Sequence, residues 1–238
     1  MKLLVLSCGM LSLFAGCVAE PNASDYTLSR EYRPAESLFE EDEGTASLFT
    51  SDQAVLGGDT IEKILNSKIT IAQNARLAVI RFTQSRYAWW SDEFMQMDQT
   101  LQTGFIEQLR KCPRLTDVSL LPSLMTPEKK TIPYLREAAA RYQADLLLVY
   151  RSANRFYSRY KIFKPDEAKA TCIVEAILLD VRSGIVPFTS VSFQKYKIEK
   201  SKEDYDLSET IAKAEINSVS KALEEIGSDL LKFLEAAQ

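Results

Sequence analysis

Between residues 76 and 237, apolar runs typical of buried strands alternate twice with amphipathic helical stripes, and then three strand-like runs follow one another without a helix. The predicted strands cover residues 76–82, 114–124, 144–163, 169–184 and 185–200, and the predicted helices cover 91–112, 131–143 and 207–237. Parallel strands need a crossover helix between them, whereas antiparallel strands can be joined by a short turn. The order β-α-β-α-β-β-β-α therefore predicts an α/β (α+β) fold with a mixed five-stranded sheet and helices packed on it.

The last predicted helix carries a regular apolar stripe. Its members recur at spacings of 3 and 4 and are Ile216, Val219, Leu223, Ile226, Leu230 and Phe233. Because the stripe covers fewer than three heptads, we expect this helix to pack on the sheet of its own chain rather than to form an intermolecular coiled coil.

The chain opens with MKLLVLSCGMLSLFAGC, in which one cation precedes an apolar run too short to span a bilayer, which takes about 20 residues. Such a run is typical of a signal peptide. Residues 14–17 resemble the bacterial lipobox, in which the signal is removed before a cysteine whose thiol carries diacylglycerol. We therefore predict a signal peptide over residues 1–16 and an anchor of diacylglycerol and palmitate at Cys17, which would hold the chain on a membrane. The alternative is an ordinary secretory signal cleaved near Ala19.

Val18 follows the predicted lipid-attachment site. In the enterobacterial lipoproteins that this N-terminus resembles, an Asp at that position retains the protein at the inner membrane. We therefore expect the chain to reside at the outer membrane, with its body facing the periplasm.

Residues 17–52 form an acidic segment without a sustained hydrophobic period. Positions 18–52 hold nine acids and only two cations, so the segment cannot bury enough apolar surface to offset its ordering entropy. We predict a flexible tether here and a single, nearly neutral α/β domain over residues 53–238. Two apolar islands, Leu38-Phe39 and Leu48-Phe49, interrupt the tether, and we expect them to dock on the body.

The chain contains no histidine, which excludes Ser-His and Cys-His catalytic pairs and every histidine-based metal site. Phosphate-binding glycine loops and nucleophile elbows are also absent from the sequence. We therefore predict no metal, no cofactor and no enzymatic activity. The enzymatic alternative is an envelope hydrolase that uses two of the carboxylates of Asp92, Glu93, Glu175 and Asp180.

Cys112 and Cys172 are the cysteines that remain after signal removal and acylation of Cys17. An oxidising compartment permits a disulfide between them, which would stabilise the fold by about 4 kcal/mol. Two separate buried thiols are the other alternative, and the spacing does not decide between the two.

Residues 150–164, YRSANRFYSRYKIFK, combine five cations with five aromatic residues and no acid. In a cytosolic chain this composition is typical of nucleic-acid binding, but the expected location outside the cytoplasm argues against a nucleic-acid partner. Strand alternation places the candidate binding residues on one face; they are Arg151, Arg155, Tyr157, Arg159 and Lys161. This face is either a solvated outer surface of the sheet or a contact surface for an envelope protein, an anionic wall glycan or the acidic tether itself.

Trp89 and Trp90 are adjacent in the loop YAWW. Neighbouring residues of an extended chain point in opposite directions, so at least one indole is expected to be exposed. The pair is a candidate partner-binding site, and the alternative is a cap over the core.

The strings LREAAARYQADLLLVY (residues 135–150) and LLDVRSGIVPF (residues 178–188), together with the order of elements over about residues 70–235, carry a family resemblance. They resemble the periplasmic α/β module shared by the N-terminal domain of the Tol-system β-propeller protein, the curli-secretion lipoprotein and the lipoprotein activators of peptidoglycan synthases. The spacing of elements is similar to that of the rhombotarget lipoprotein group. The resemblance implies the α/β fold and an outer-membrane lipoprotein.

These observations predict a non-catalytic, lipid-anchored protein that binds another envelope protein as an assembly or regulatory factor. The alternative is a structural subunit that self-associates at the outer membrane. Both alternatives assign the body a binding role, because the sequence offers cations and aromatic residues but no catalytic motif.

Overall fold

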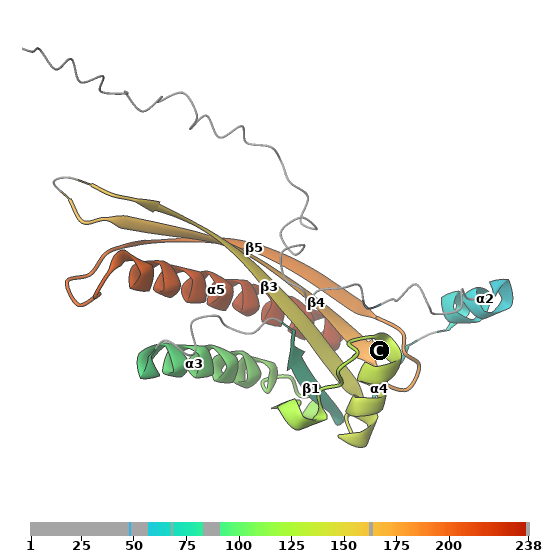
Figure 1. Ribbon diagram of the computed structural model, residues 1–238. Helices are drawn as coiled ribbons and strands as arrows, with labels where there is room; N and C mark the ends of the chain where they lie inside the picture. The colour runs from blue at the N-terminus through green and yellow to red at the C-terminus, as the bar shows by residue number, and fades with distance from the viewer. Residues whose placement is uncertain (1–47, 49–56, 68, 83–90, 162–163, 237–238) are drawn as a thin grey trace, which may run out of the picture. The chain divides into compact units, whose positions relative to one another are not determined.

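The computed structural model describes residue 48 and residues 57–67, 69–82, 91–161 and 164–236 (Figure 1). The strands are β1 (Ala75–Arg81), β2 (Leu115–Leu120), β3 (Leu146–Arg159), β4 (Glu167–Asp180) and β5 (Phe188–Glu199). The helices are α2 (Gly58–Asn66), α3 (Asp92–Leu109), η1 (Ser123–Met125, a 3₁₀ turn), α4 (Ile132–Arg141) and α5 (Leu207–Ala236).

The strands form one five-stranded sheet in the order β2-β1-β3-β4-β5. β1 is parallel to both β2 and β3, whereas β3, β4 and β5 pair antiparallel. The predicted mixed five-stranded sheet and α/β fold are therefore confirmed. β2 ends at Leu120, four residues before the predicted boundary, because Pro122 has no N–H to donate and the 3₁₀ turn η1 follows it.

Helices cover both faces of the sheet. One face packs against α3 and α5, and its core includes Leu77, Leu148, Val174 and Leu223. The other face packs against α4 through a smaller cluster. The apolar stripe of α5 faces the first of these clusters, so the expectation that the last helix packs on its own sheet is confirmed.

The helices begin where the sequence predicts. Ser91 precedes α3, and its Oγ accepts a hydrogen bond from the N–H of Phe94 at 3.3 Å, which satisfies one free donor of the first turn. α4 begins after Thr131 with Pro133 in its first turn. α2 buries none of its residues.

The string DVRSG forms the tight turn between β4 and β5. One carboxylate oxygen of Asp180 accepts hydrogen bonds from the backbone N–H and the hydroxyl of Ser183 at 2.7 and 3.0 Å. Gly184 has a φ of 77°, a left-handed conformation that favours glycine. Arg136 of α4 donates to the carbonyl of Val181 at 3.0 Å, which holds this turn against the helix.

Cys112 and Cys172 are separate buried thiols in the same core cluster. Burial raises the pKa of the Cys172 thiol to about 12, and a hydrogen bond with Ser218 opposes this shift only in part. The thiolate form of Cys172, which is the form that reacts, is therefore scarce at neutral pH.

We expect both thiols to resist iodoacetamide in the folded protein and to react after unfolding in denaturant without reductant. Mass spectrometry of the labelled peptides reads out each site. If Cys112 and Cys172 stay unlabelled in the unfolded, unreduced chain, they form a disulfide, contrary to the structure.

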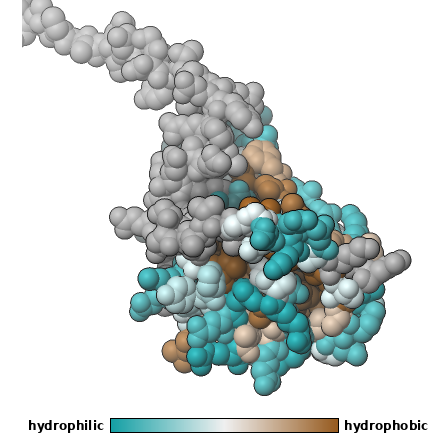
Figure 2. Space-filling model, turned by 90° about the vertical axis from the view of Figure 1, so that its right-hand side faces the viewer, coloured by the Kyte–Doolittle hydropathy of each residue, from teal (hydrophilic) through white to brown (hydrophobic). Residues whose placement is uncertain are grey.

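Within the described residues, no helix is both long enough and apolar enough to cross a bilayer. Figure 2 shows one face of the molecule, where hydrophilic residues cover most of the described surface and hydrophobic residues emerge only in small patches. The predicted signal peptide, Cys17, Trp89 and Trp90, and the tether apart from Leu48 lie outside the described residues.

Candidate binding surface on the open sheet face

The hairpin of β3 and β4 continues well past the end of β1 (Figure 1). β1 pairs with β3 only as far as Tyr150, and α4 covers the same side of the sheet only at the start of β3 and the end of β4. Beyond that point, no helix among the described residues packs against this side of β3, β4 and β5. We call this three-stranded area the open face.

The strand register arranges the open face in rows that run across the three strands. Starting next to α4, the rows are Arg151–Glu175–Val191, Ala153–Ile173–Phe193, Arg155–Thr171–Lys195, Tyr157–Lys169–Lys197 and Arg159–Glu167–Glu199. The row nearest α4 contains the Arg151–Glu175 ion pair and Val191, the second row is apolar, and the next two are cationic. Val191, Phe193 and Tyr157 are 64%, 53% and 55% exposed. Such large apolar side chains gathered on one exposed surface mark interaction sites.

Each acid of the open face lies next to a cation, including Glu199, which is 3.9 Å from the Nζ of Lys161. Glu175 binds Arg151 in the same row at 2.8 Å. Glu167 binds Lys161 at 2.7 Å and also binds Lys197, and hydrogen bonds from these two lysines lower the pKa of Glu167 to about 2. The cations left without a carboxylate partner among the described residues are Arg155, Arg159, Lys169 and Lys195. The open face therefore carries an excess of positive charge.

The structure places most of the predicted binding residues together. Arg151, Arg155, Tyr157 and Arg159 share one face of β3, as strand alternation predicts. Lys161 lies beyond the end of β3 and binds Glu167 at the margin of the open face. Arg151 is engaged by Glu175, so it contributes less free charge than the sequence suggested.

Sequence reasoning missed the contributions of β4 and β5, namely Lys169, Val191, Phe193 and Lys195. The alternation in the string SVSFQKYK (residues 190–197) carried a signal, because every second residue there is apolar or cationic. Only the register shows that these side chains share a face with Arg155 and Tyr157.

The structure does not gather the carboxylates of the hydrolase alternative. Glu93 binds Lys213 of α5 at 3.2 Å, on the side of the sheet that α3 and α5 cover. Glu175 lies on the open face, and Asp180 holds the β4–β5 turn. Among the described residues, no group of His, Cys, Asp and Glu side chains is arranged to hold a metal ion.

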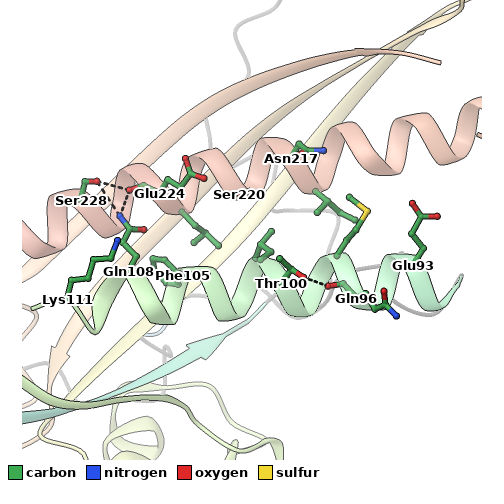
Figure 3. Close-up of a pocket in the computed structure, with 15 residues that line it drawn as sticks. Glu93, Gln96, Thr100, Phe105, Gln108, Lys111, Asn217, Ser220, Glu224 and Ser228 are labelled. Atoms are coloured by element: carbon green, nitrogen blue, oxygen red, sulfur yellow. Dashed lines mark hydrogen bonds between the residues drawn. The ribbon is translucent and has the colours of Figure 1, made fainter. Parts of the chain in front are cut away.

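A groove of about 820 Å³ lies between α3 and α5, with Lys111 and Glu93 near its two ends (Figure 3). Gln108 reaches across it and donates hydrogen bonds to the carbonyl of Glu224 at 2.8 Å and to the Oγ of Ser228 at 3.3 Å. A Cβ on Gly227 would lie 2.5 Å from the Oε1 of Gln108, so glycine permits this close approach. The groove is therefore bridged by its own side chains and is the packing seam of the two helices.

A partly buried ionic cluster ties the start of α5 to α3. The Nζ of Lys213 binds Asp204 and Glu209 at 2.8 Å each and Glu93 at 3.2 Å. Burial of Asp204 opposes its ionisation, but hydrogen bonds from Lys213, Ser201 and Thr210 outweigh burial and keep its pKa below the usual value. Hydrogen bonds from Lys213 and from the N–H of Tyr205 also lower the pKa of Glu209. This cluster holds the end of the β5–α5 loop in place.

No family model matches the chain, and no curated protein matches it. Among solved structures, it is similar to the PelC dodecamer from Paraburkholderia phytofirmans, with 19% identity over 66% of this chain and 93% of that chain and a TM-score of 0.33. It is also similar to lipoprotein GNA1162 from Neisseria meningitidis, with 12% identity over 62% of this chain and 99% of that chain and a TM-score of 0.29.

A third similar structure is a minor lipoprotein from Acinetobacter baumannii, with 7% identity over 68% of this chain and 94% of that chain and a TM-score of 0.32. At these TM-scores the likeness carries no inference about function, and the fold rests on the strand pairing of this chain. Bacterial lipoproteins are thus among the structures to which the chain is similar, and the resemblance to the rhombotarget lipoprotein group stays a prediction.

Proposed function

We propose that this protein is a non-catalytic, lipid-anchored envelope protein that binds another envelope protein through the open face, as an assembly or regulatory factor. The anchor is the predicted acylated Cys17, and the predicted location is the outer membrane with the body facing the periplasm. The observation that carries the proposal is the composition of the open face: exposed Val191, Phe193 and Tyr157 lie beside four cations that lack a carboxylate partner among the described residues.

This composition defines the chemistry of the partner. Exposed apolar side chains next to cationic rows suit a surface on which apolar side chains adjoin carboxylates. Tyr and Arg are enriched among the residues that contribute most binding energy at protein interfaces, and Tyr157, Arg155 and Arg159 are of these types. The paired acids at the margin of the open face keep Arg151 and Lys161 from adding to the excess charge.

Photo-cross-linking in intact cells tests the proposal. A benzophenone amino acid in place of Tyr157 is expected to capture an envelope protein. The additional substitution Phe193→Ser is expected to weaken binding, and so lower the yield, about thirtyfold, because a central aromatic contact contributes about 2 kcal/mol. The matched control is Leu124→Ser, which alters an exposed side chain of η1 away from the open face.

The same photo-reactive residue in place of Tyr205, which is exposed in the β5–α5 loop, is expected to capture far less of that protein. An equal yield from positions 157 and 205, or an unchanged yield after Phe193→Ser, would contradict the proposal. A product with the mass of two copies of the chain would instead favour the self-associating subunit.

A further inference from the structure

Leu48 connects the acidic N-terminal segment to the border of the open face. Its side chain packs against the cluster beneath α4, and its carbonyl oxygen accepts a hydrogen bond from the N–H of Ile132 at 3.4 Å. Val149 and Ile177 belong to the same cluster and form the row that immediately precedes the open face. The chain before Leu48 therefore starts from the edge of this surface.

Residues 36–47, ESLFEEDEGTAS, complement the open face in charge. They contain five acids, Glu36, Glu40, Glu41, Asp42 and Glu43, and no cation. The open face presents Arg155, Arg159, Lys169 and Lys195 without carboxylate partners among the described residues. Opposite charges that meet across a surface favour and orient its occupant.

The spacing of the charges also matches. Residues 40–43 lie five to eight positions before Leu48, so an extended chain places them about 16 to 26 Å from it. The rows of Arg155 and Tyr157 lie six and eight residues along β3 from Val149, which is about 20 and 26 Å. The acids can thus reach the cationic rows, while the small residues 44–47 cross the two rows nearest α4.

We propose that residues 36–47 of the chain itself occupy the open face when no partner is bound there, with Glu40–Glu43 against the cations of β3, β4 and β5. The inference rests on the proposed function in one respect, since it assigns a second occupant to the same surface. A partner with carboxylates then binds by displacing the acidic segment.

Carbodiimide cross-linking tests this contact with the natural side chains, because it joins a carboxylate to a lysine amine only where the two touch. The whole chain is purified in detergent, and equal parts of ¹⁵N-labelled and unlabelled protein are mixed, cross-linked and digested. We expect links from residues 40–43 to Lys169 or Lys195, in peptides of a single isotopic composition. Exposed Lys111, just after α3, and exposed Lys232 of α5 belong to the helices on the other side of the sheet and are expected to give no such links.

The substitutions Arg155→Ser and Arg159→Ser together are expected to lower the yield of these links about fivefold, since they remove attraction without removing a linked residue. Screening by salt is expected to do the same. The matched control changes two exposed arginines elsewhere, Arg110→Ser and Arg141→Ser, and is expected to leave the yield unchanged.

Links spread evenly over Lys111, Lys195 and Lys232 would overturn the inference. So would links of mixed isotopic composition, which would place a second copy on the open face. Because the purified chain contains no partner, the result is independent of the photo-cross-linking in cells. If the carbodiimide links form but no partner is captured in cells, only the proposed function is contradicted. If a partner is captured in cells but the carbodiimide links do not form, only this inference is contradicted.

Discussion

Replacing Lys213 by methionine is expected to lower the free energy of unfolding by about 3–5 kcal/mol at neutral pH. The substitution removes the cation that Asp204, Glu209 and Glu93 share, and the side chain of Asp204 is only 1% exposed. A buried carboxylate that loses its counter-ion keeps its desolvation cost, and its neighbours then repel it. Urea unfolding monitored by circular dichroism measures the loss.

The effect of Lys213→Met is expected to depend on pH. Lys213 holds the pKa values of Asp204 and Glu209 below their usual values, so its contribution is complete above about pH 4–5 and is lost as the pH falls through the lowered values. The difference in stability between the unaltered protein and the variant should therefore be largest near pH 7 and should shrink towards about pH 3. A difference that is constant with pH would show that the loss comes from packing alone.

Lys232→Met is the matched control for Lys213→Met on the same helix. Lys232 binds Asp229 at 3.1 Å in an exposed pair of the i,i+3 type. Exposed pairs contribute at most about 1 kcal/mol. Equal losses for the two variants would contradict the assignment of the Lys213 cluster as a partly buried ionic cluster that stabilises the fold.

Leu230→Ala is expected to destabilise the protein by about 3–4 kcal/mol. Leu230 is fully buried in the core cluster that α3 and α5 form with the sheet. Truncation there removes apolar contacts and leaves a cavity, since α5 is held along its length and cannot collapse into the space.

The same substitution at Leu124, which is 98% exposed, is expected to change stability by no more than about 0.5 kcal/mol. Thermal or urea unfolding of the two variants in parallel gives the comparison. A loss below about 1 kcal/mol for Leu230→Ala would mean that α5 does not pack on the sheet as described.

The element order and the side-chain faces could be predicted because they depend on local periodicity. A period of 2 in residues 146–159 separates the buried Tyr150 from the outward Arg151, and spacings of 3 and 4 place Leu223 and Leu230 on one side of α5. The sequence pattern did not predict that β1 lies between β2 and β3, because the order of strands in a sheet depends on how the whole sheet is buried against its helices.

The open face was predicted in part. The pattern of β3 alone identified Arg155, Tyr157 and Arg159, but not that Val191 and Phe193 lie beside them. The pairing of Arg151 with Glu175 was also missed, since it depends on a register between residues 24 positions apart. The Lys213 cluster joins α3, α5 and the loop after β5, and no local pattern marks such a meeting of separate segments.

By itself, the sequence determined which segments become strands and helices and which side chains alternate outward, because backbone geometry sets these periods within each segment. Only the tertiary structure decided the register, the four cations without a carboxylate partner among the described residues, the separation of Cys112 from Cys172 and the position of Leu48 at the edge of the open face. These depend on contacts between residues far apart in the chain, which form only when the apolar faces of all the elements are buried together.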